Sequence, residues 1–191
     1  MCDDTVHTEP NQRCGVFIRI PGNNNRTVQS VLDWYPKKGY FGWHCSQLCE
    51  VPDEVLKTCF SFAIVRNPFE RLLSVYKTNV SGEEYSFEKF VNDVCSDNTT
   101  SLDPVLVKKT RPQWTYLTNL ENDILVDFVL RYDTLHQDFE TVVKELDLPP
   151  TVTIPYDVSP NIENVLVFFT EEMKKKVRKF YEIDFVTLNF K

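Results

Sequence analysis

The sequence predicts an α/β fold: a small central parallel sheet flanked by helices, in one domain over residues 1–191. Two observations support this prediction. Two short apolar runs, residues 16–20 and 60–65, are each followed by a polar turn and then by apolar residues at helical spacing. Two strand-to-helix units in succession are typical of a parallel sheet, since parallel strands need a crossover connection that is usually a helix. Residues 1–14 show no such pattern and are predicted to be a loose N-terminal segment.

The first unit is predicted as a strand over residues 16–20, a polar loop, and a helix capped by Thr27. A threonine hydroxyl can accept a hydrogen bond from the free N–H groups of a first helical turn. The apolar stripe of this helix has the spacing i, i+3, i+4, i+7 and consists of Val28, Val31, Leu32 and Tyr35.

The second unit has a clearer pattern. Residues 60–65 are an unbroken apolar run, which predicts a strand covered on both faces. Asn67 is expected to cap the following helix, and Pro68 suits its first turn. The buried side of that helix is predicted to carry Phe69, Leu72, Leu73 and Tyr76.

Further elements follow from the same patterns. Residues 124–132 are predicted as a third strand, and residues 149–160, which contain several prolines, as a long loop. Lysines and arginines on the outer face of the last helix are interpreted as solvated. The apolar stripes of three helices are Phe87, Phe90, Val91 and Val94; Leu135, Phe139, Val142 and Leu146; and Met173, Val177, Phe180 and Tyr181.

The composition excludes several classes of protein. The net charge of −7 argues against non-specific binding of DNA or RNA, which depends on Lys and Arg contacts to phosphates. No window approaches the ~20 apolar residues of a membrane span, and the first 15 residues lack the apolar core of a signal peptide. Although His44, Cys45 and Cys49 lie close together, no second pair has the spacing of a zinc finger, so no metal site is predicted. The six cysteines leave the compartment open.

Two strand-to-helix junctions are candidate binding sites. Ligands of open α/β sheets bind at the carboxyl ends of strands, where helix N-termini favour anions. At the first junction, residues 20–27 offer backbone N–H groups, a hydroxyl and the guanidinium of Arg26, although the Walker A pattern is absent. At the second, Arg66 ends the strand and Ser74 lies about two turns into the helix, so both can reach one anion. The alternative makes Arg66 a surface ion pair and Ser74 an ordinary helix residue.

Residues 62–76, F-A-I-V-R-N-P-F-E-R-L-L-S-V-Y, carry a resemblance. They are similar to the F-x-x-V-R-N-P-x-x-R-L-x-S-x-Y segment of carbohydrate sulfotransferases, in the branch of the heparan and uronyl 2-O-sulfotransferases. Weaker similarities follow in the family's order, so that the resemblance covers residues 16–190. They lie at residues 20–27, 44–48, 111–117, 126–135 and 177–190.

This resemblance implies a three-layer, P-loop-like fold and an enzyme that transfers the sulfuryl group of 3′-phosphoadenosine-5′-phosphosulfate (PAPS). The acceptor would be a hydroxyl of a carbohydrate or related small compound, the nucleotide product would be 3′-phosphoadenosine-5′-phosphate (PAP), and no metal would be needed. Arg66 and Ser74 would hold the 3′-phosphate, while Tyr132 would border the adenine. The 5′-phosphosulfate loop would consist of Gly22, Asn23, Asn24, Asn25, Arg26 and Thr27.

The resemblance also implies the remaining roles. His44 would be the general base, and Arg111, Gln113 and Trp114 would face the acceptor. The family usually carries a lysine where this chain has Gly22, and Arg26 or Arg19 would have to supply the missing charge. Because arginine stays protonated and differs in shape from lysine, that replacement would be imperfect.

Because Gly22 replaces the usual lysine, an alternative function is that the protein binds a nucleotide or glycan and is catalytically weak or inactive. A third possibility is a secreted interaction domain stapled by its cysteines. Asn25 belongs to a glycosylation triplet, and a glycan there would block the donor loop, which favours a cytoplasmic chain over a domain of the Golgi lumen. The acidic net charge favours a weakly charged acceptor unless a local patch such as Lys108, Lys109 and Arg111 attracts a charged one.

Overall fold

The computed structural model describes residues 15–18, 42–45, 57, 59–80, 85–96, 102–119, 123–154 and 162–190, and only the backbone of the first two ranges. The predicted phosphosulfate loop, residues 22–27, and the first predicted helix lie outside these residues. So do the predicted N-terminal segment, residues 1–14, and residues 155–160 of the predicted long loop.

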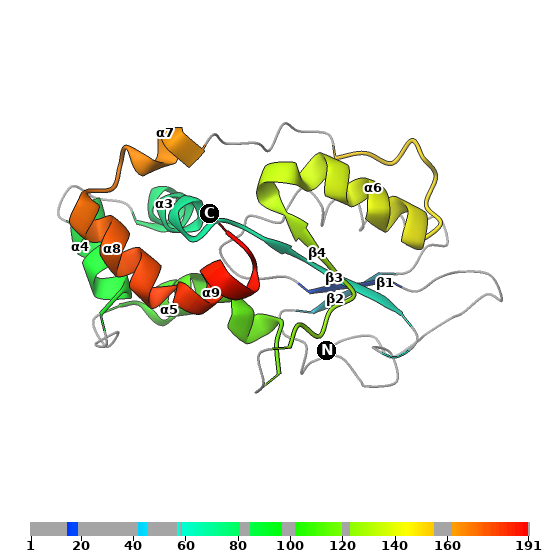
Figure 1. The fold of residues 1–191 in the computed structure, drawn as a ribbon, viewed down its shortest axis with the longest axis horizontal. Helices are drawn as coiled ribbons and strands as arrows, with labels where there is room; N and C mark the ends of the chain where they lie inside the picture. The colour runs from blue at the N-terminus through cyan, green and yellow to red at the C-terminus, as the bar shows by residue number, and fades with distance from the viewer. Residues whose placement is uncertain are drawn as a thin grey trace.

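Four parallel strands form the sheet, in the order β2-β1-β3-β4 (Figure 1). They are β1 (Gly15–Ile18), β2 (Gly42–Cys45), β3 (Phe60–Val65) and β4 (Phe128–Arg131). β3 lies between β1 and β4, and all of its residues after Phe60 are buried. The prediction of an α/β protein with a central parallel sheet is confirmed.

The junction between β3 and α3 (Pro68–Asn79) forms as its residue types predict. The side-chain oxygen of Asn67 accepts a hydrogen bond from the N–H of Phe69 at 3.0 Å, which satisfies a donor that the helix itself leaves free. Pro68 occupies the first helical position, where its missing N–H costs nothing. The chain therefore turns directly from the end of a central strand into a helix.

One face of the sheet is covered by α6 (Leu135–Glu145), which lies over β3 and β4 (Figure 1). Phe62 and Ile64 alternate along β3 and point to this face, since side chains two residues apart share one side of a strand. They pack against buried α6 residues. The described part of the predicted long loop, residues 149–154, is non-helical and adds two buried side chains. The buried members of this cluster are Phe62, Ile64, Leu130, Leu135, Phe139, Val142, Val143, Leu146, Leu148, Val152 and Ile154.

A second core lies at the carboxyl end of β3, where α3 and five other helices gather (Figure 1). These helices are α4 (Phe87–Val94), α5 (Pro104–Thr110), α7 (Ile162–Leu166), α8 (Glu171–Phe180) and α9 (Glu182–Thr187). Phe69 at the start of α3 is fully enclosed, and its ring meets that of Phe169 edge-on at 5.1 Å. This packing holds the first turn of α3 in place.

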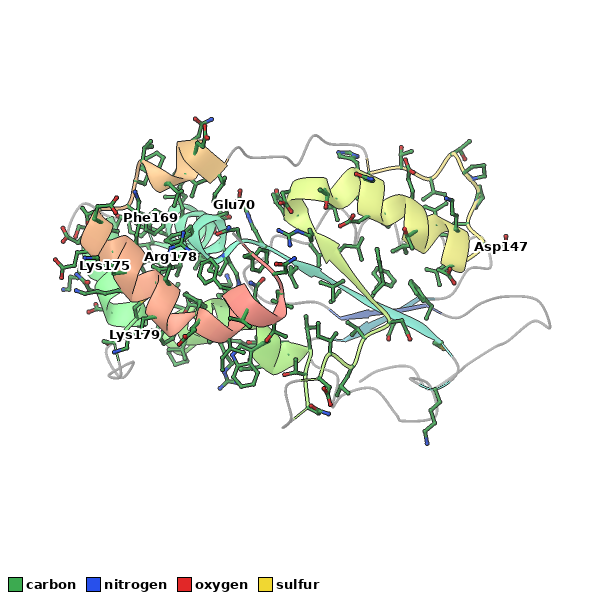
Figure 2. All side chains as sticks on the ribbon, viewed as in Figure 1. Glu70, Asp147, Phe169, Lys175, Arg178 and Lys179 are labelled. Atoms are coloured by element: carbon green, nitrogen blue, oxygen red, sulfur yellow. The ribbon has the colours of Figure 1, made fainter. Side chains whose placement is uncertain are left out.

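Lys175 and Lys179 of α8 are exposed, as predicted (Figure 2). Arg178 is also exposed, but its guanidinium lies over the rings of Phe69 and Phe185, at 5.6 and 5.4 Å from their centroids. Two other lysines of α8 pair with glutamates of its own first turn: Lys174 with Glu171 at 2.7 Å and Lys176 with Glu172 at 2.9 Å. Such exposed pairs contribute little to stability.

The structure departs from the predicted strands at two places. The predicted strand over residues 124–132 forms only from Phe128 to Arg131, because Ile124 instead makes an antiparallel bridge with Thr118. Asp127 directly precedes β4, and its carboxylate accepts hydrogen bonds from the N–H and hydroxyl of Ser61 in β3 at 2.8 and 2.7 Å. The strand β2 has no predicted counterpart, since G-W-H-C is short and lacks a β-branched pattern.

The three-layer, P-loop-like form stays a prediction, because most of the chain between β1 and β3 lies outside the described residues. Within the described ranges, no helix combines the length and apolar character needed to cross a bilayer. Those ranges also contain no group of three or more His, Cys, Asp or Glu side chains placed to hold a metal ion.

Candidate functional site

The candidate site begins where β3 and β4 end side by side. Val65 pairs with Arg131 in the parallel register, so Arg66 and Tyr132 are the first residues beyond the paired ends of the two strands. Equivalent positions on neighbouring parallel strands point to the same side. The guanidinium of Arg66 accordingly lies over the ring of Tyr132, 4.2 Å from its centroid. The resulting cation–π contact orients the arginine at the carboxyl edge of the sheet.

Arg66 is a buried cation whose hydrogen-bonding capacity is incompletely used. Only 9% of its surface is exposed. Its Nε lies 3.5 Å from Oε2 of Glu70, which is too far for a good hydrogen bond. In the described part of the chain, this Nε is a buried side-chain donor without a hydrogen-bond acceptor. Because buried polar groups are almost always paired, an unpaired donor on a cation at a helix N-terminus fits an anion-binding site.

Glu70 shares this site and is itself buried at the N-terminal end of α3 (Figure 2). Burial raises the pKa of Glu70, and the nearby guanidinium of Arg66 opposes that rise. Sequence reasoning missed Glu70 as a site residue. The detectable signal is its spacing, since a carboxylate four residues after an arginine can reach it across one helical turn.

The pH dependence of stability tests this environment. Since the pKa of Glu70 is raised in the folded protein, its ionisation destabilises the fold as pH rises above about 4.3, the ordinary pKa of glutamate. Glu70→Gln removes that titration. From pH 4 to pH 7, the wild type should therefore lose stability relative to Glu70→Gln, so that the free energy of unfolding of the variant minus that of the wild type increases. Urea titrations of both proteins at several pH values measure this difference in the free energy of unfolding. If the difference stays constant or decreases as pH rises, the pKa of Glu70 is not raised.

Ser74 lies one helical turn beyond Glu70 on α3 and is half-buried. Residues four apart share a face of a helix, so Glu70 and Ser74 both lie on the side of α3 that the Arg66–Glu70 pair occupies. The structure therefore brings together Arg66 and Tyr132 at the β3–α3 junction and places Ser74 one turn beyond Glu70 on α3. Their contact with a nucleotide stays a prediction.

Gln113 has a different position from the one its predicted role requires. It opens the short 3-10 helix η4 (Gln113–Tyr116) and has no exposed surface. Its Oε1 accepts a hydrogen bond from the N–H of Arg66 at 2.9 Å, and its Nε2 donates one to the carbonyl of Arg66 at 2.8 Å. A direct contact between Gln113 and an acceptor substrate is not supported by this geometry. The side chain instead holds the backbone of Arg66.

Arg111 and Trp114 flank Gln113 and stay predicted acceptor contacts. Arg111 is exposed, and its carbonyl accepts a hydrogen bond from the buried guanidinium of Arg71 at 2.8 Å. Trp114 is half-buried, and its N–H donates to Oδ1 of Asp184 at 2.8 Å. Both residues thus lie on a segment that is tied to α3 and α9, close to the backbone of Arg66.

The predicted general base, His44, belongs to β2, and its side chain lies outside the described residues. The register aligns His44 with Phe17 of β1, and Phe17 with Phe62 of β3. His44 is therefore two strands from β3 and four residues before the level of Arg66. From strand spacing and rise, the two backbones are on the order of 15 Å apart.

Asp184 on α9 is a second buried carboxylate near the site that sequence reasoning missed. It is fully enclosed and lies between Tyr181 and Leu188, which are buried members of the same helical face. A carboxylate at the i+3 position of an apolar stripe is the signal that could have identified it, because charged side chains are rarely buried without partners.

The comparisons with known proteins agree with this architecture. The model of a sulfotransferase family matches residues 16–191, which is nearly the whole chain. The match covers β2, β3, β4 and all of β1 after Gly15, together with the β3–α3 junction and the helices of the second core. A comparison with curated proteins gave no match.

Proposed function

We propose, from the premise that this chain belongs to the sulfotransferase family, that it transfers the sulfuryl group of PAPS to a hydroxyl of a carbohydrate or related small acceptor. The observation that carries the proposal is Arg66, a nine-tenths buried residue beside the N-terminus of α3 whose Nε has no hydrogen-bond acceptor among the described residues. A phosphate would supply the missing acceptor oxygens. The specific relation to heparan and uronyl 2-O-sulfotransferases and the P-loop-like fold belong to the same proposal.

The described residues fit the 3′-phosphate end of the donor. Arg66 would bind the phosphate through charge-assisted hydrogen bonds, and the hydroxyl of Ser74 would add a further contact from the same side of α3. The guanidinium of Arg66 lies over one face of the Tyr132 ring. The other face or the edge of this ring would contact the adenine. The 5′-phosphosulfate would be held by residues 22–27, through backbone N–H groups and Arg26.

The chemistry requires an acceptor oxygen to attack sulfur while the bond to the bridging oxygen of the 5′-phosphate breaks. PAP leaves with that electron pair, so negative charge grows on the leaving oxygen. Positioning and electrostatic stabilisation therefore supply most of the catalysis. The acceptor's proton would pass to His44, whose ordinary pKa of about 6.5 suits a general base. In this proposal, His44 and Arg66 would act at opposite ends of one extended nucleotide.

Gly22 favours a second candidate, a protein that binds PAP or a glycan with little or no turnover. The lysine that the family usually has at this position would stabilise the leaving oxygen, and Arg26 or Arg19 would replace it here. Incubation with PAPS carrying radiolabelled sulfate, together with a panel of neutral and uronic-acid glycans, distinguishes the two candidates. Label transfer supports the enzyme. Binding of PAP without transfer supports the second candidate, and absence of both contradicts the proposal.

The acceptor is proposed to be weakly charged, because the net charge of −7 opposes the approach of a heavily sulfated polymer. The exposed Arg111 and its neighbours Lys108 and Lys109 are the local exception on α5. The proposed compartment is the cytoplasm, with the Golgi lumen as the alternative, since a glycan on Asn25 would obstruct the donor loop.

Replacement of the proposed base should separate catalysis from binding. His44→Ala is expected to lower turnover by about 10²–10⁴-fold while the affinity for PAP stays unchanged, because the base acts on the acceptor's proton. His136→Ala, which removes an exposed histidine from α6, is the matched control and should leave turnover unchanged. Equal turnover in the two variants would exclude His44 from the mechanism.

A further inference from the structure

A buried chain of hydrogen bonds connects α9 to the backbone of Arg66. Asp184 accepts from the N–H of Gln113 through Oδ2 at 2.9 Å and from the N–H of Trp114 through Oδ1 at 2.8 Å. The Nε2 of Gln113 lies 3.4 Å from the same Oδ2. Gln113 in turn bonds both backbone groups of Arg66. Asp184, Gln113 and the Arg66 backbone are hereafter called the clasp.

The first step of the clasp fixes the segment that carries Gln113. The residue before η4 is Pro112, which has no side-chain acceptor, so the first N–H groups of this 3-10 helix have no local cap. Asp184 provides the cap from a distant position in the sequence, since each of its carboxylate oxygens receives one N–H. A carboxylate in this role is favoured because charged acceptors make shorter and stronger bonds.

The second step fixes the backbone beyond the end of β3. The ladder with β4 ends at Val65 and Arg131, so Arg66 has no partner strand there. The side-chain amide of Gln113 takes the place of a strand, because it presents one donor and one acceptor as a neighbouring peptide group would. The backbone of Arg66 is therefore held on both its polar groups.

Buried charge near the clasp is balanced by Arg71. Its guanidinium is enclosed and donates to the carbonyl of Arg111, two residues before Gln113. Burial raises the pKa of Asp184, whereas the N–H donors of Gln113 and Trp114 and the charge of Arg71 lower it. The two carboxylate oxygens of Asp184 both act as acceptors, which is the arrangement of the ionised form.

We infer that Gln113 and Asp184 are positioning residues for the donor's 3′-phosphate: they fix the backbone of Arg66 and thereby aim its guanidinium, without touching the nucleotide themselves. This inference rests on the proposed function. Among the described residues, the guanidinium contacts the ring of Tyr132 and makes a long contact to Glu70. Its direction therefore depends on the backbone that the clasp holds, and a preorganised arginine loses less freedom when phosphate binds.

The test compares two ligands that differ only at the 3′ position, PAP and adenosine 5′-phosphate. Gln113→Met keeps the length of the side chain but removes its two hydrogen bonds to the backbone of Arg66. In this variant the affinity for PAP should fall about tenfold, whereas the affinity for adenosine 5′-phosphate should not change. Thr115→Ala is the matched control. It removes a hydrogen bond inside η4, from the Thr115 hydroxyl to the carbonyl of Pro112 at 2.6 Å, and should leave both affinities unchanged.

A ligand-specific loss separates positioning from a structural role, since general loosening would weaken both ligands together. Equal losses for both ligands, or no loss, would overturn the inference. Failure of the wild type to bind PAP would overturn it along with the proposed function, whereas wild-type binding with unchanged selectivity in Gln113→Met would overturn this inference alone.

A measurement on the wild type applies even where Gln113→Met does not fold. Saturation with PAP should slow the hydrogen exchange of the N–H groups of Gln113 and Trp114, which bond to Asp184 and are not proposed to contact the nucleotide. Slower exchange at these two positions supports coupling through the clasp. Unchanged exchange there, with PAP bound, would overturn the inference.

Discussion

Replacing Arg66 and Glu70 together by glutamine should weaken PAP binding by about 100-fold or more while the fold is kept. Two hydrogen bonds from a guanidinium to a phosphate contribute roughly 1.5–3 kcal/mol each, and every 1.4 kcal/mol is tenfold in affinity. Both residues are replaced because Arg66→Gln alone leaves the Glu70 carboxylate buried without its cation, at a cost of about 3–5 kcal/mol in stability. Isothermal titration with PAP measures the effect.

Glu70→Gln is the control for this double variant. It keeps the guanidinium of Arg66 and the cation–π contact with Tyr132, so it should still bind PAP. The difference between the two variants isolates Arg66. If the double variant binds PAP as tightly as Glu70→Gln, Arg66 does not hold the phosphate, and its buried position serves the fold alone.

Asp184→Ala should lower the free energy of unfolding by about 3–5 kcal/mol. The substitution leaves the buried N–H of Gln113 and the part-buried N–H of Trp114 without their acceptors, at about 1–3 kcal/mol for each buried donor. It also removes a counter-charge from the enclosed Arg71, and an uncompensated buried charge is costly. Urea unfolding followed by circular dichroism measures the loss, which is a large part of the stability of an ordinary domain.

Asp133→Ala is the matched control for Asp184→Ala. Asp133 is an exposed aspartate that pairs with Arg131 at 3.2 Å, and exposed pairs contribute at most about 1 kcal/mol. The two substitutions should therefore differ severalfold in their effect on the free energy of unfolding. Similar small losses in both variants would show that the segment from Arg111 to Trp114 is held by other contacts.

The elements that the sequence predicts well are those whose signals are local. The run F-S-F-A-I-V is apolar and β-prone throughout, and Asn67 and Pro68 form a cap and a first turn by their own side chains. Because each of these preferences agrees with the tertiary structure, β3 and α3 appear where they are predicted. The helices α4, α6 and α8 follow likewise from apolar stripes of helical spacing.

Elements that depend on distant partners are not predictable in this way. β2 has only four residues and no strong strand pattern. β4 is shortened because Ile124 forms a bridge with Thr118 and because the carboxylate of Asp127 accepts a hydrogen bond from Ser61, 66 residues away in the sequence. Glu70 and Asp184 are recognisable as charges in apolar surroundings, but their partners are contributed by other elements. For the same reason the sequence suggests Gln113 as a substrate contact. In the structure, the side-chain amide of Gln113 forms hydrogen bonds with the backbone of Arg66, 47 residues away in the sequence.

Recognition of a 3′-phosphate by Arg66, at the carboxyl edge of β3, underlies the proposed function. The most direct measurement is a pair of calorimetric titrations of the wild-type protein, one with PAP and one with adenosine 5′-phosphate. PAP should bind about 100-fold more tightly, because only PAP presents the phosphate that satisfies the buried guanidinium. Equal affinities for the two nucleotides, or no binding of PAP at all, would contradict this prediction.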